Sequence, residues 1–103
     1  MLYGEEKYII EFAEAAIISF TEFSRNYTTY LHQHNETDFR KAGHKIKPVA
    51  KMLGIEQIID EYEHGKTLIW DEKPEEDLKE SSEKITCICD EVIDELQQII
   101  SNI

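Results

Sequence analysis

The chain has 103 residues and a formal net charge of −11, with 22 acidic against 11 basic side chains and 41% hydrophobic residues. This length predicts a single domain over residues 1–103 with a modest core, and the apolar fraction is too high for a disordered chain. The acidic balance argues against nucleic acid as a partner, because a phosphate backbone would repel most of this surface.

The sequence shows no membrane or export signal. No apolar run approaches the ~20 residues that a membrane span needs, and residues 1–7 lack the basic-then-apolar order of a signal peptide. We therefore expect a cytoplasmic protein without membrane insertion. Cys87 and Cys89 lie two apart in a helical pattern and point to different faces, so we expect reduced packing residues rather than a disulfide or a metal site.

The first half of the chain predicts two helices. A long helix is expected over residues 5–33, and it would bend or break, if anywhere, near residues 17–19. Its apolar positions step by three or four: Ile9, Phe12, Ala16, Phe20, Phe23, Tyr27 and Leu31. Asn35 is a good N-cap with Asp38 three residues on, which predicts a second helix over residues 36–53. Gly54 follows as its C′ residue.

The second half predicts two more helices. One is expected from Ile55 to Glu63 or a little beyond, with Gly65 near its end and Ile55, Ile58, Ile59 and Tyr62 facing inward. Residues 66–73 are the loosest region, although Leu68, Ile69 and Trp70 are expected to pack. Pro74 suits the first turn of a last helix. Its stripe is Leu78, Ser81, Ile85, Ile88, Val92, Leu96, Ile99 and Ile103. With no competing strand pattern, we predict an all-α, antiparallel four-helix bundle.

Residues 39–54 contain no acid, in a chain with twice as many acids as bases. This run carries five cations and His44, so the rest of the chain has a net charge of −16. The cations are Arg40, Lys41, Lys45, Lys47 and Lys51. An acidic protein with one basic strip around a histidine is expected to present that strip to a negatively charged partner.

On a helix, this run separates a core face from an outer face. At ~100° per residue, its small and apolar residues gather on one side: Phe39, Ala42, Gly43, Ile46, Val49, Ala50 and Leu53. His44 falls about 160° from Ile46. Arg40, Lys47 and Lys51 share its outer surface. We therefore expect an exposed His44, ringed by cations and away from the carboxylates of its own helix.

Residues 42–54 read AGHKIKPVAKMLG. This segment resembles the signature of the histidine-containing phosphotransfer (HPt) domain, which is a His, an apolar residue two positions on, a Lys three positions on, then small residues and a Leu-Gly pair. Here these are His44, Ile46, Lys47, Ala50, Leu53 and Gly54. The resemblance covers residues 20–65 and elsewhere only the helical pattern. HPt domains look like four-helix bundles with the active His exposed midway along the second helix.

The resemblance implies a phosphorelay carrier. His44 would accept a phosphoryl group from a receiver-domain aspartyl phosphate and return it to another receiver aspartate. Imidazole suits this role because much of it is unprotonated and nucleophilic near pH 7. Lys47, one turn later, can reach the phosphoryl oxygens as a point charge. The surface expected to contact the acidic pocket of the receiver comprises Arg40, Lys41, Lys45, Pro48 and Lys51.

Such a carrier depends on its partner for catalysis. The sequence has no Gly-rich phosphate loop or nucleotide-binding motif, so we expect no kinase activity of its own and no cofactor. Mg²⁺ and most catalytic groups are expected on the partner, a response-regulator receiver domain. The chain would be free-standing, or part of or partner to a hybrid sensor histidine kinase. We expect a monomer, since nothing in the sequence calls for a dimer.

Pro48 departs from the family pattern, which commonly has Gly four residues after the His. Proline has no N–H, so the carbonyl of His44 loses its helical partner and is crowded by the ring. We expect a local bend or widened turn at His44, with the carbonyl facing solvent. Because the proline side chain is short, a receiver could still approach closely.

Other polar residues carry less specific signals. His32, His34 and His64 are interpreted as incidental, and His32 with His34 lacks the third ligand that a metal site needs. Glu63, His64 and Lys66 lie where the family often supplies a side chain that orients the imidazole, and the sequence does not select among them. The main alternative function is a non-catalytic helical interaction or dimerisation module with an inert histidine. A metal-binding bundle is a distant third.

Overall fold

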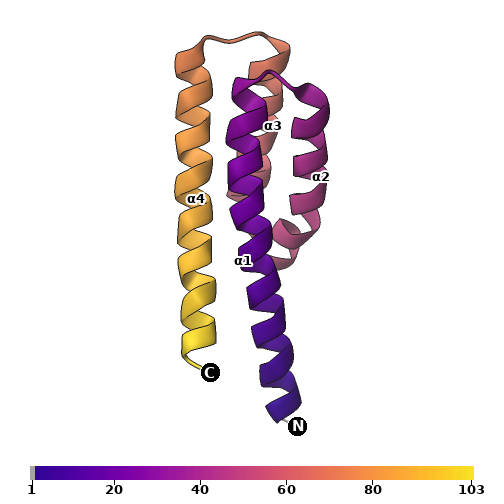
Figure 1. Ribbon diagram of the computed structural model, residues 1–103, viewed down its shortest axis with the longest axis vertical. Coiled ribbons are helices and arrows are strands. Elements are labelled where there is room, and N and C mark those ends of the chain that lie inside the picture. The colour runs from indigo at the N-terminus through magenta and orange to yellow at the C-terminus, as the bar shows by residue number, and fades with distance from the viewer. Residues whose placement is uncertain (1) are drawn as a thin grey trace.

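The computed structural model describes residues 2–103, with side chains described from residue 5 onward. Over this range the chain forms four helices and no strand. They are α1 (Leu2–His32), α2 (Glu36–Leu53), α3 (Glu56–Trp70) and α4 (Glu75–Ser101). Each helix runs antiparallel to the one before it, and α4 returns alongside α1 (Figure 1). The predicted fold class, an antiparallel four-helix bundle, is confirmed.

The boundaries of α2 follow from the two cap residues that the sequence singled out. The side chain of Asn35 accepts a hydrogen bond from the Asp38 N–H at 3.2 Å. At the other end Gly54 adopts the left-handed conformation, with φ 70°, and its N–H reaches the last turn of the helix. Both are the arrangements expected of an N-cap and of a C′ glycine. Position 44 therefore lies near the middle of a well-delimited helix.

The core beneath α2 is built around aromatic rings from three helices. Phe39 of α2 lies between Tyr27 of α1 and Tyr62 of α3, with ring centroids 4.8 and 5.2 Å away. Gly65 makes this possible, since a Cβ there would stand 2.5 Å from the Tyr27 hydroxyl and 2.7 Å from the Phe39 ring. Gly65 is thus a buried mid-helix residue of α3 and not a helix end, which corrects the prediction.

The third helix is longer than predicted, and one aromatic residue lies on its outside. α3 continues to Trp70, so most of the region interpreted as loose is helical. Leu68 and Ile69 are buried as expected, but Trp70 is 75% exposed. The reason is angular: Leu68 and Ile69 continue the stripe of Gly65, and Trp70 falls a further 100° around the helix, beyond the core. In the first helix, no interruption occurs at residues 17–19.

The outer ends of the two long helices leave apolar positions uncovered. α1 and α4 have 31 and 27 residues against 18 and 15 for α2 and α3, so their free ends extend past the shorter pair (Figure 1). The predicted core positions Ile9, Phe12, Ile99 and Ile103 are exposed there. Within residues 2–103, none of the helices has the apolar length that a membrane crossing requires.

The two cysteines are both free and lie on different faces of α4. Cys89 is buried, as expected of a packing residue, and burial raises the pKa of its thiol to about 12. Cys87 is exposed, so its expected packing role is wrong. A step of two residues turns a helix by about 200°, which carries Cys87 away from the core that holds Cys89.

Candidate functional site

His44 lies on the outer surface of α2, as its angular position predicts. Its two flanking core residues, Gly43 and Ile46, are buried, while His44 itself is exposed. Among the residues that the structure describes, no side-chain hydrogen bond or ion pair involves the imidazole. The ring is therefore open to an incoming group, with no fixed tautomer.

Helix α3 approaches α2 closely at Gly43, just before His44. The buried ring of Tyr62 lies against Gly43, in the space that a side chain would otherwise fill. The Tyr62 hydroxyl donates to the carbonyl of Arg40 at 3.3 Å. Burial raises the pKa of this phenol, and the neighbouring Glu63 carboxylate adds to the effect. Tyr62 thus fixes the α2–α3 spacing at the turn that carries His44.

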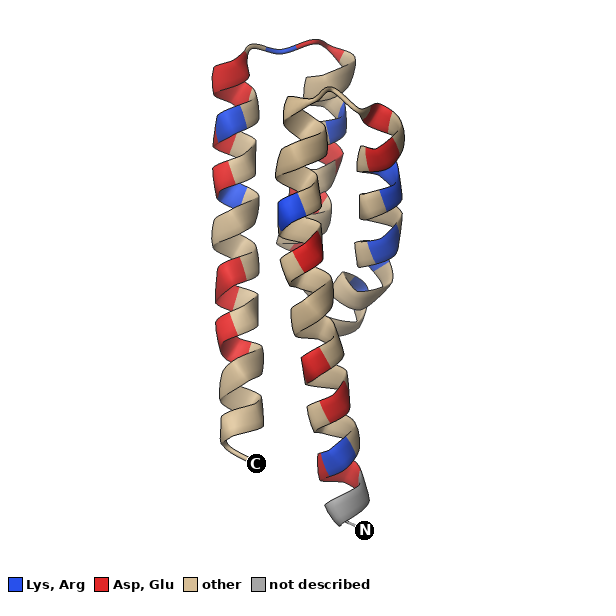
Figure 2. Cartoon of the chain, viewed as in Figure 1, with Lys and Arg blue, Asp and Glu red and all other residues tan. Residues whose placement is uncertain are grey.

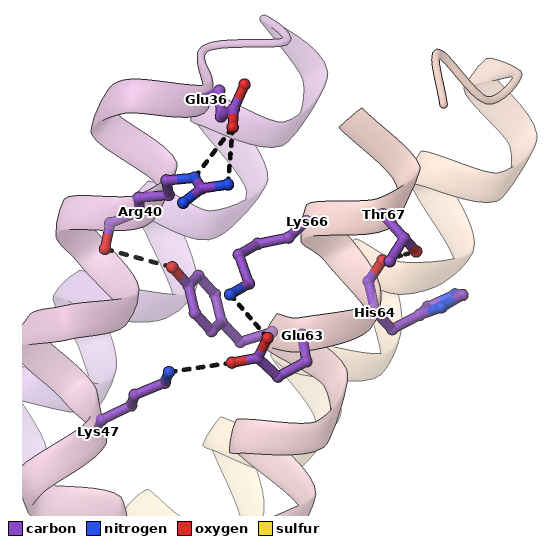
Figure 3. Close-up of polar contacts among 8 residues, drawn as sticks. Glu36, Arg40, Lys47, Glu63, His64, Lys66 and Thr67 are labelled. Carbon is purple, nitrogen blue, oxygen red and sulfur yellow. Dashed lines mark hydrogen bonds and ion pairs between the residues drawn. The ribbon is translucent and has the colours of Figure 1, made fainter. Parts of the chain in front are cut away.

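Two lysines lie over this tyrosine ring and share one carboxylate, that of Glu63 (Figure 3). Lys47 Nζ is 3.0 Å from Glu63 Oε1, and Lys66 Nζ is 2.7 Å from Glu63 Oε2. Both ammonium groups also lie 5.2–5.3 Å from the centroid of the Tyr62 ring, within the range of a cation–π contact. Hydrogen bonds from Lys66 and Lys47 hold the pKa of Glu63 below its usual range. Glu63 is therefore an anion bridging α2 to its own helix.

Among the residues that the structure describes, none of the three polar residues of α3 hydrogen-bonds the imidazole, but they differ in the direction they face. Glu63 and Lys66 face α2, whereas His64 points away from it (Figure 3). His64 lines a cleft of about 680 Å³ between α3 and α4, together with Glu61 and Lys84. Of the three, only Glu63 and Lys66 stand on the side of α3 that could act on a group bound to α2.

The basic strip is less free than its sequence suggests. Carboxylates from three helices neutralise part of it, because an acid-free run in sequence can still be flanked by acids in space. Arg40 pairs with Glu36 in its own helix, at 2.9 Å, and Lys45 pairs with Glu22 of α1 at 3.3 Å. Arg40 is thus neutralised by a carboxylate of its own helix.

Two cations of the strip remain without such a partner. Lys41 and Lys51 are exposed and form no ion pair with any residue that the structure describes. Figure 2 shows the charge distribution: α2 carries basic bands after its acidic first turn, whereas the bands on α4 and on the free end of α1 are mainly acidic. The strip therefore still presents net positive charge to an approaching anion, despite its internal pairs.

Pro48 is exposed and lies inside α2, which remains a single helix from Glu36 to Leu53. The local bend or widened turn predicted at His44 therefore does not break the helix. Because proline lacks an N–H, the His44 carbonyl has no donor four residues on. Pro48 adds a smooth, uncharged surface to the exposed side of the helix, one turn from the imidazole.

Two other polar clusters lie outside this region. His32, at the end of α1, joins Glu75 through Nδ1 and the Ser82 hydroxyl through Nε2 at 3.1 Å, both on α4. Ser82 is buried in mid-helix, where backbone N–H groups are already bonded and cannot stabilise an oxyanion. We interpret this cluster as a link between helices, which gives the apparently incidental His32 a structural contact.

The second cluster is buried between α1, α3 and α4. Ser81 donates to the carboxylate of Glu61 at 2.7 Å, and the Tyr27 hydroxyl lies 2.6 Å from Ser81 and 2.9 Å from the Glu61 carbonyl. Lys84 lies 3.3 Å from the other oxygen of that carboxylate. Within the described part of the chain, no group of three or more His, Cys, Asp or Glu side chains is arranged to hold a metal ion.

No protein-family model matches the chain, and neither does any curated protein or solved structure. The chemistry of α2 and α3 is therefore the basis for assigning a function.

Proposed function

We propose that this protein is a phosphorelay carrier of the HPt type, with His44 as the phosphoacceptor. The observation that carries the proposal is an exposed, unbonded imidazole in the middle of α2, set in a basic strip of an acidic four-helix bundle. The sequence from His44 to Gly54 supports the same role, since it resembles the HPt signature. Lys47, one turn from His44, supplies the nearby positive charge.

The transfer step needs little from the carrier itself. The unprotonated ring nitrogen of His44 attacks the phosphorus of an aspartyl phosphate on a receiver domain. The N–P bond forms as the bond between phosphorus and the acyl oxygen breaks, and the aspartate carboxylate leaves with the bonding electron pair. No base is required on the carrier, because neutral imidazole already presents a lone pair. The reverse step passes the phosphoryl group to a second receiver aspartate.

Charge compensation is the carrier's other contribution. Phosphoryl transfer depends mainly on in-line positioning and on balancing the charge of the equatorial oxygens. Lys47 serves that purpose, while Mg²⁺ and the remaining catalytic groups belong to the receiver. On this proposal the chain is a transfer intermediate with no kinase activity of its own.

Recognition of the receiver follows from the charge pattern. Lys41 and Lys51 are exposed without internal ion pairs, so they are the cations best placed to steer toward an acidic receiver pocket. Arg40 and Lys45 join the same surface after exchanging a protein carboxylate for a partner group. Pro48 provides an uncharged contact close to His44. We propose a monomeric, cytoplasmic carrier that meets one receiver at a time on this face.

The alternative is a helical interaction or dimerisation module in which His44 is inert. The observation that favours it is the set of exposed apolar side chains on the other helices, among them Tyr8, Ile18 and Trp70. The two functions differ in what they require of position 44. A carrier fails without the imidazole, whereas an interaction module of this kind does not use it.

The deciding experiment is phosphotransfer from a panel of pre-phosphorylated receiver domains at neutral pH. Wild type is compared with His44→Gln and with His64→Gln, a matched control because His64 is also exposed but lies on α3. We expect acid-labile label on wild type and on His64→Gln, and none on His44→Gln. Absence of label on a folded wild type across the whole panel would favour the interaction module.

A further inference from the structure

The Lys47–Glu63–Lys66 cluster already has the form of an anion site with an anion bound in it. Two ammonium groups converge on one carboxylate, each on a different oxygen, and both lie over the same tyrosine ring. The lysine side chains are only 27% exposed and Glu63 is 46% exposed, so the pairs are partly shielded from solvent. The cation best placed for a phosphoryl group on His44 is thus occupied by an internal counter-ion.

The position of Lys47 makes it the member that can change partner. Residues three apart on a helix have Cβ atoms about 5–6 Å apart, so Lys47 can reach either Glu63 on α3 or a group on His44. Lys66 sits on α3, one turn after Glu63 and on the same helix. The two lysines therefore differ. Lys47 can pair either with Glu63 or with a phosphoryl group on His44, whereas Lys66 lies one turn from Glu63 on the same helix and stays paired with it.

We propose that Glu63 is an internal counter-anion that competes with the phosphoryl group of His44 for Lys47. Loading of His44 then exchanges the Lys47–Glu63 pair for a Lys47–phosphoryl pair, while Lys66 stays on Glu63 and keeps that carboxylate neutralised. This inference rests on the proposed carrier function and adds a regulatory residue to the same site.

The exchange is electrostatically favourable for Lys47 and unfavourable for Glu63. A phosphoryl group carries more negative charge than a carboxylate and three acceptor oxygens, so Lys47 gains by moving. Glu63 loses one of two cations, and this loss lowers the net gain. Glu63 therefore sets the phosphoryl group potential of the carrier: it makes the loaded state less stable than Lys47 alone would, and so favours onward transfer to a receiver.

The first test is the equilibrium share of phosphoryl group between carrier and receiver. Glu63→Gln removes the competing charge and keeps the side-chain shape, and we expect about a two- to five-fold shift toward loaded His44, the range set by exposed ion pairs. Glu83→Gln is the control, because it makes the same charge change at an exposed carboxylate of α4 that forms no ion pair with any residue the structure describes. That variant should match wild type.

A double-mutant cycle assigns the effect to Lys47. In a Lys47→Met background, Glu63→Gln should no longer shift the equilibrium. Thermal melts of each variant check that the bundle is intact. An unchanged equilibrium in Glu63→Gln would overturn the proposal, and so would a shift toward the empty carrier, which would mean that Glu63 positions Lys47 rather than competing for it.

A second test does not depend on any receiver. His44 is phosphorylated with phosphoramidate, with His44→Gln as the blank for the other histidines, and the carbon chemical shift of the Glu63 carboxylate is read at neutral pH, where phosphohistidine survives. We expect phosphorylation to change this chemical shift in wild type, and to change it less in Lys47→Met, where there is no pair to lose. Equal shifts in both proteins would reject the exchange. Failure of all receivers to load His44 would instead reject the carrier function.

Discussion

Gly43 of α2 and Tyr62 of α3 leave no room for a methyl group between them. A Cβ at position 43 would stand 2.0 Å from Cζ of Tyr62 and 2.2 Å from Cε1. The same ring lies beneath Lys47 and Lys66, and its hydroxyl donates a hydrogen bond to the carbonyl of Arg40. A glycine next to His44 in sequence thus sets the position of the ring on which the basic cluster is built.

Gly43→Ala is therefore expected to destabilise the bundle by about 1–3 kcal/mol, the usual cost of overpacking a filled site. Urea denaturation of the variant measures this. Gly54→Ala serves as the comparison, because Gly54 has open space around it and only its φ of 70° resists a side chain. In a Tyr62→Leu background the cost of Gly43→Ala should fall, while the cost of Gly54→Ala should not. Equal costs in both backgrounds would contradict the contact.

His44 and Ile46 should respond in opposite ways to substitution. His44→Gln is expected to change the free energy of unfolding by less than about 0.5 kcal/mol, because the side chain is exposed and unbonded. Ile46→Ala should cost about 2–5 kcal/mol, since Ile46 is buried in the core. On the carrier proposal, only the first change abolishes phosphotransfer in a folded protein. Denaturant melts and label transfer on the same samples check both expectations.

Most of the fold could be predicted because its signals are local. The steps of three and four between apolar residues, the Asn35 cap and the Gly54 terminus depend on neighbours in sequence, and all appear in the structure. The failures at the helix ends concern positions whose burial depends on other helices. Phe12 has the spacing of a core residue, but it lies on the part of α1 that extends beyond α2 and α3 and is exposed. No local pattern encodes where a neighbouring helix ends.

The site was predictable on the same terms. The exposure of His44 follows from its angle on α2, and the structure agrees. The pairing of Lys47 with Glu63, 16 residues on, could not be inferred, because it depends on the rotation of α3 about its axis. The same holds for Lys45 and Glu22, which are 23 residues apart. Charge counted along the sequence therefore overstated how many cations of the strip are free.

Pro48 offers a test of how much strain α2 tolerates beside His44. Pro48→Ala restores the N–H that the His44 carbonyl lacks and removes the ring clash, so we expect the protein to gain about 1–3 kcal/mol of stability. Phosphotransfer should persist, because the exposed side chain is a contact rather than a reacting group. Thermal melts and label transfer measure the two effects. A less stable Pro48→Ala would show that α2 depends on the proline for its local geometry.

The buried cluster of Tyr27, Ser81 and Glu61 predicts a large effect from a small change. Ser81→Ala removes the hydroxyl that donates to the Glu61 carboxylate and contacts Tyr27, and it leaves both groups buried with fewer partners. We expect a loss of about 1–3 kcal/mol. Thr86→Ala, an exposed hydroxyl on the same helix, should cost less than about 0.5 kcal/mol. Similar losses in the two variants would argue against a structural role for the cluster.

Glu63 gives the stability of the bundle a specific acid dependence. Lys66 and Lys47 hold the pKa of its carboxyl below the ordinary value, so the unfolded chain binds this proton more readily than the folded one. The stabilisation is therefore complete above the unfolded pKa, about 4.3 for Glu, and is lost as the pH falls through the lower folded value. Because Glu63 is nearly half exposed, we expect less than about 1 kcal/mol.

The measurement is the difference in unfolding free energy between wild type and Glu63→Gln at pH 7, 5 and 3. Subtraction removes the contribution of the other carboxylates, which titrate in both proteins. The difference should be constant from pH 7 to pH 5 and should shrink toward pH 3. In Lys47→Met, one of the two bonds that lower the Glu63 pKa is absent, so the difference should be smaller at pH 7 and should shrink at a higher pH. A difference independent of pH in wild type would mean that the paired lysines do not stabilise the ionised Glu63, and it would remove the electrostatic basis for its competition with a phosphoryl group.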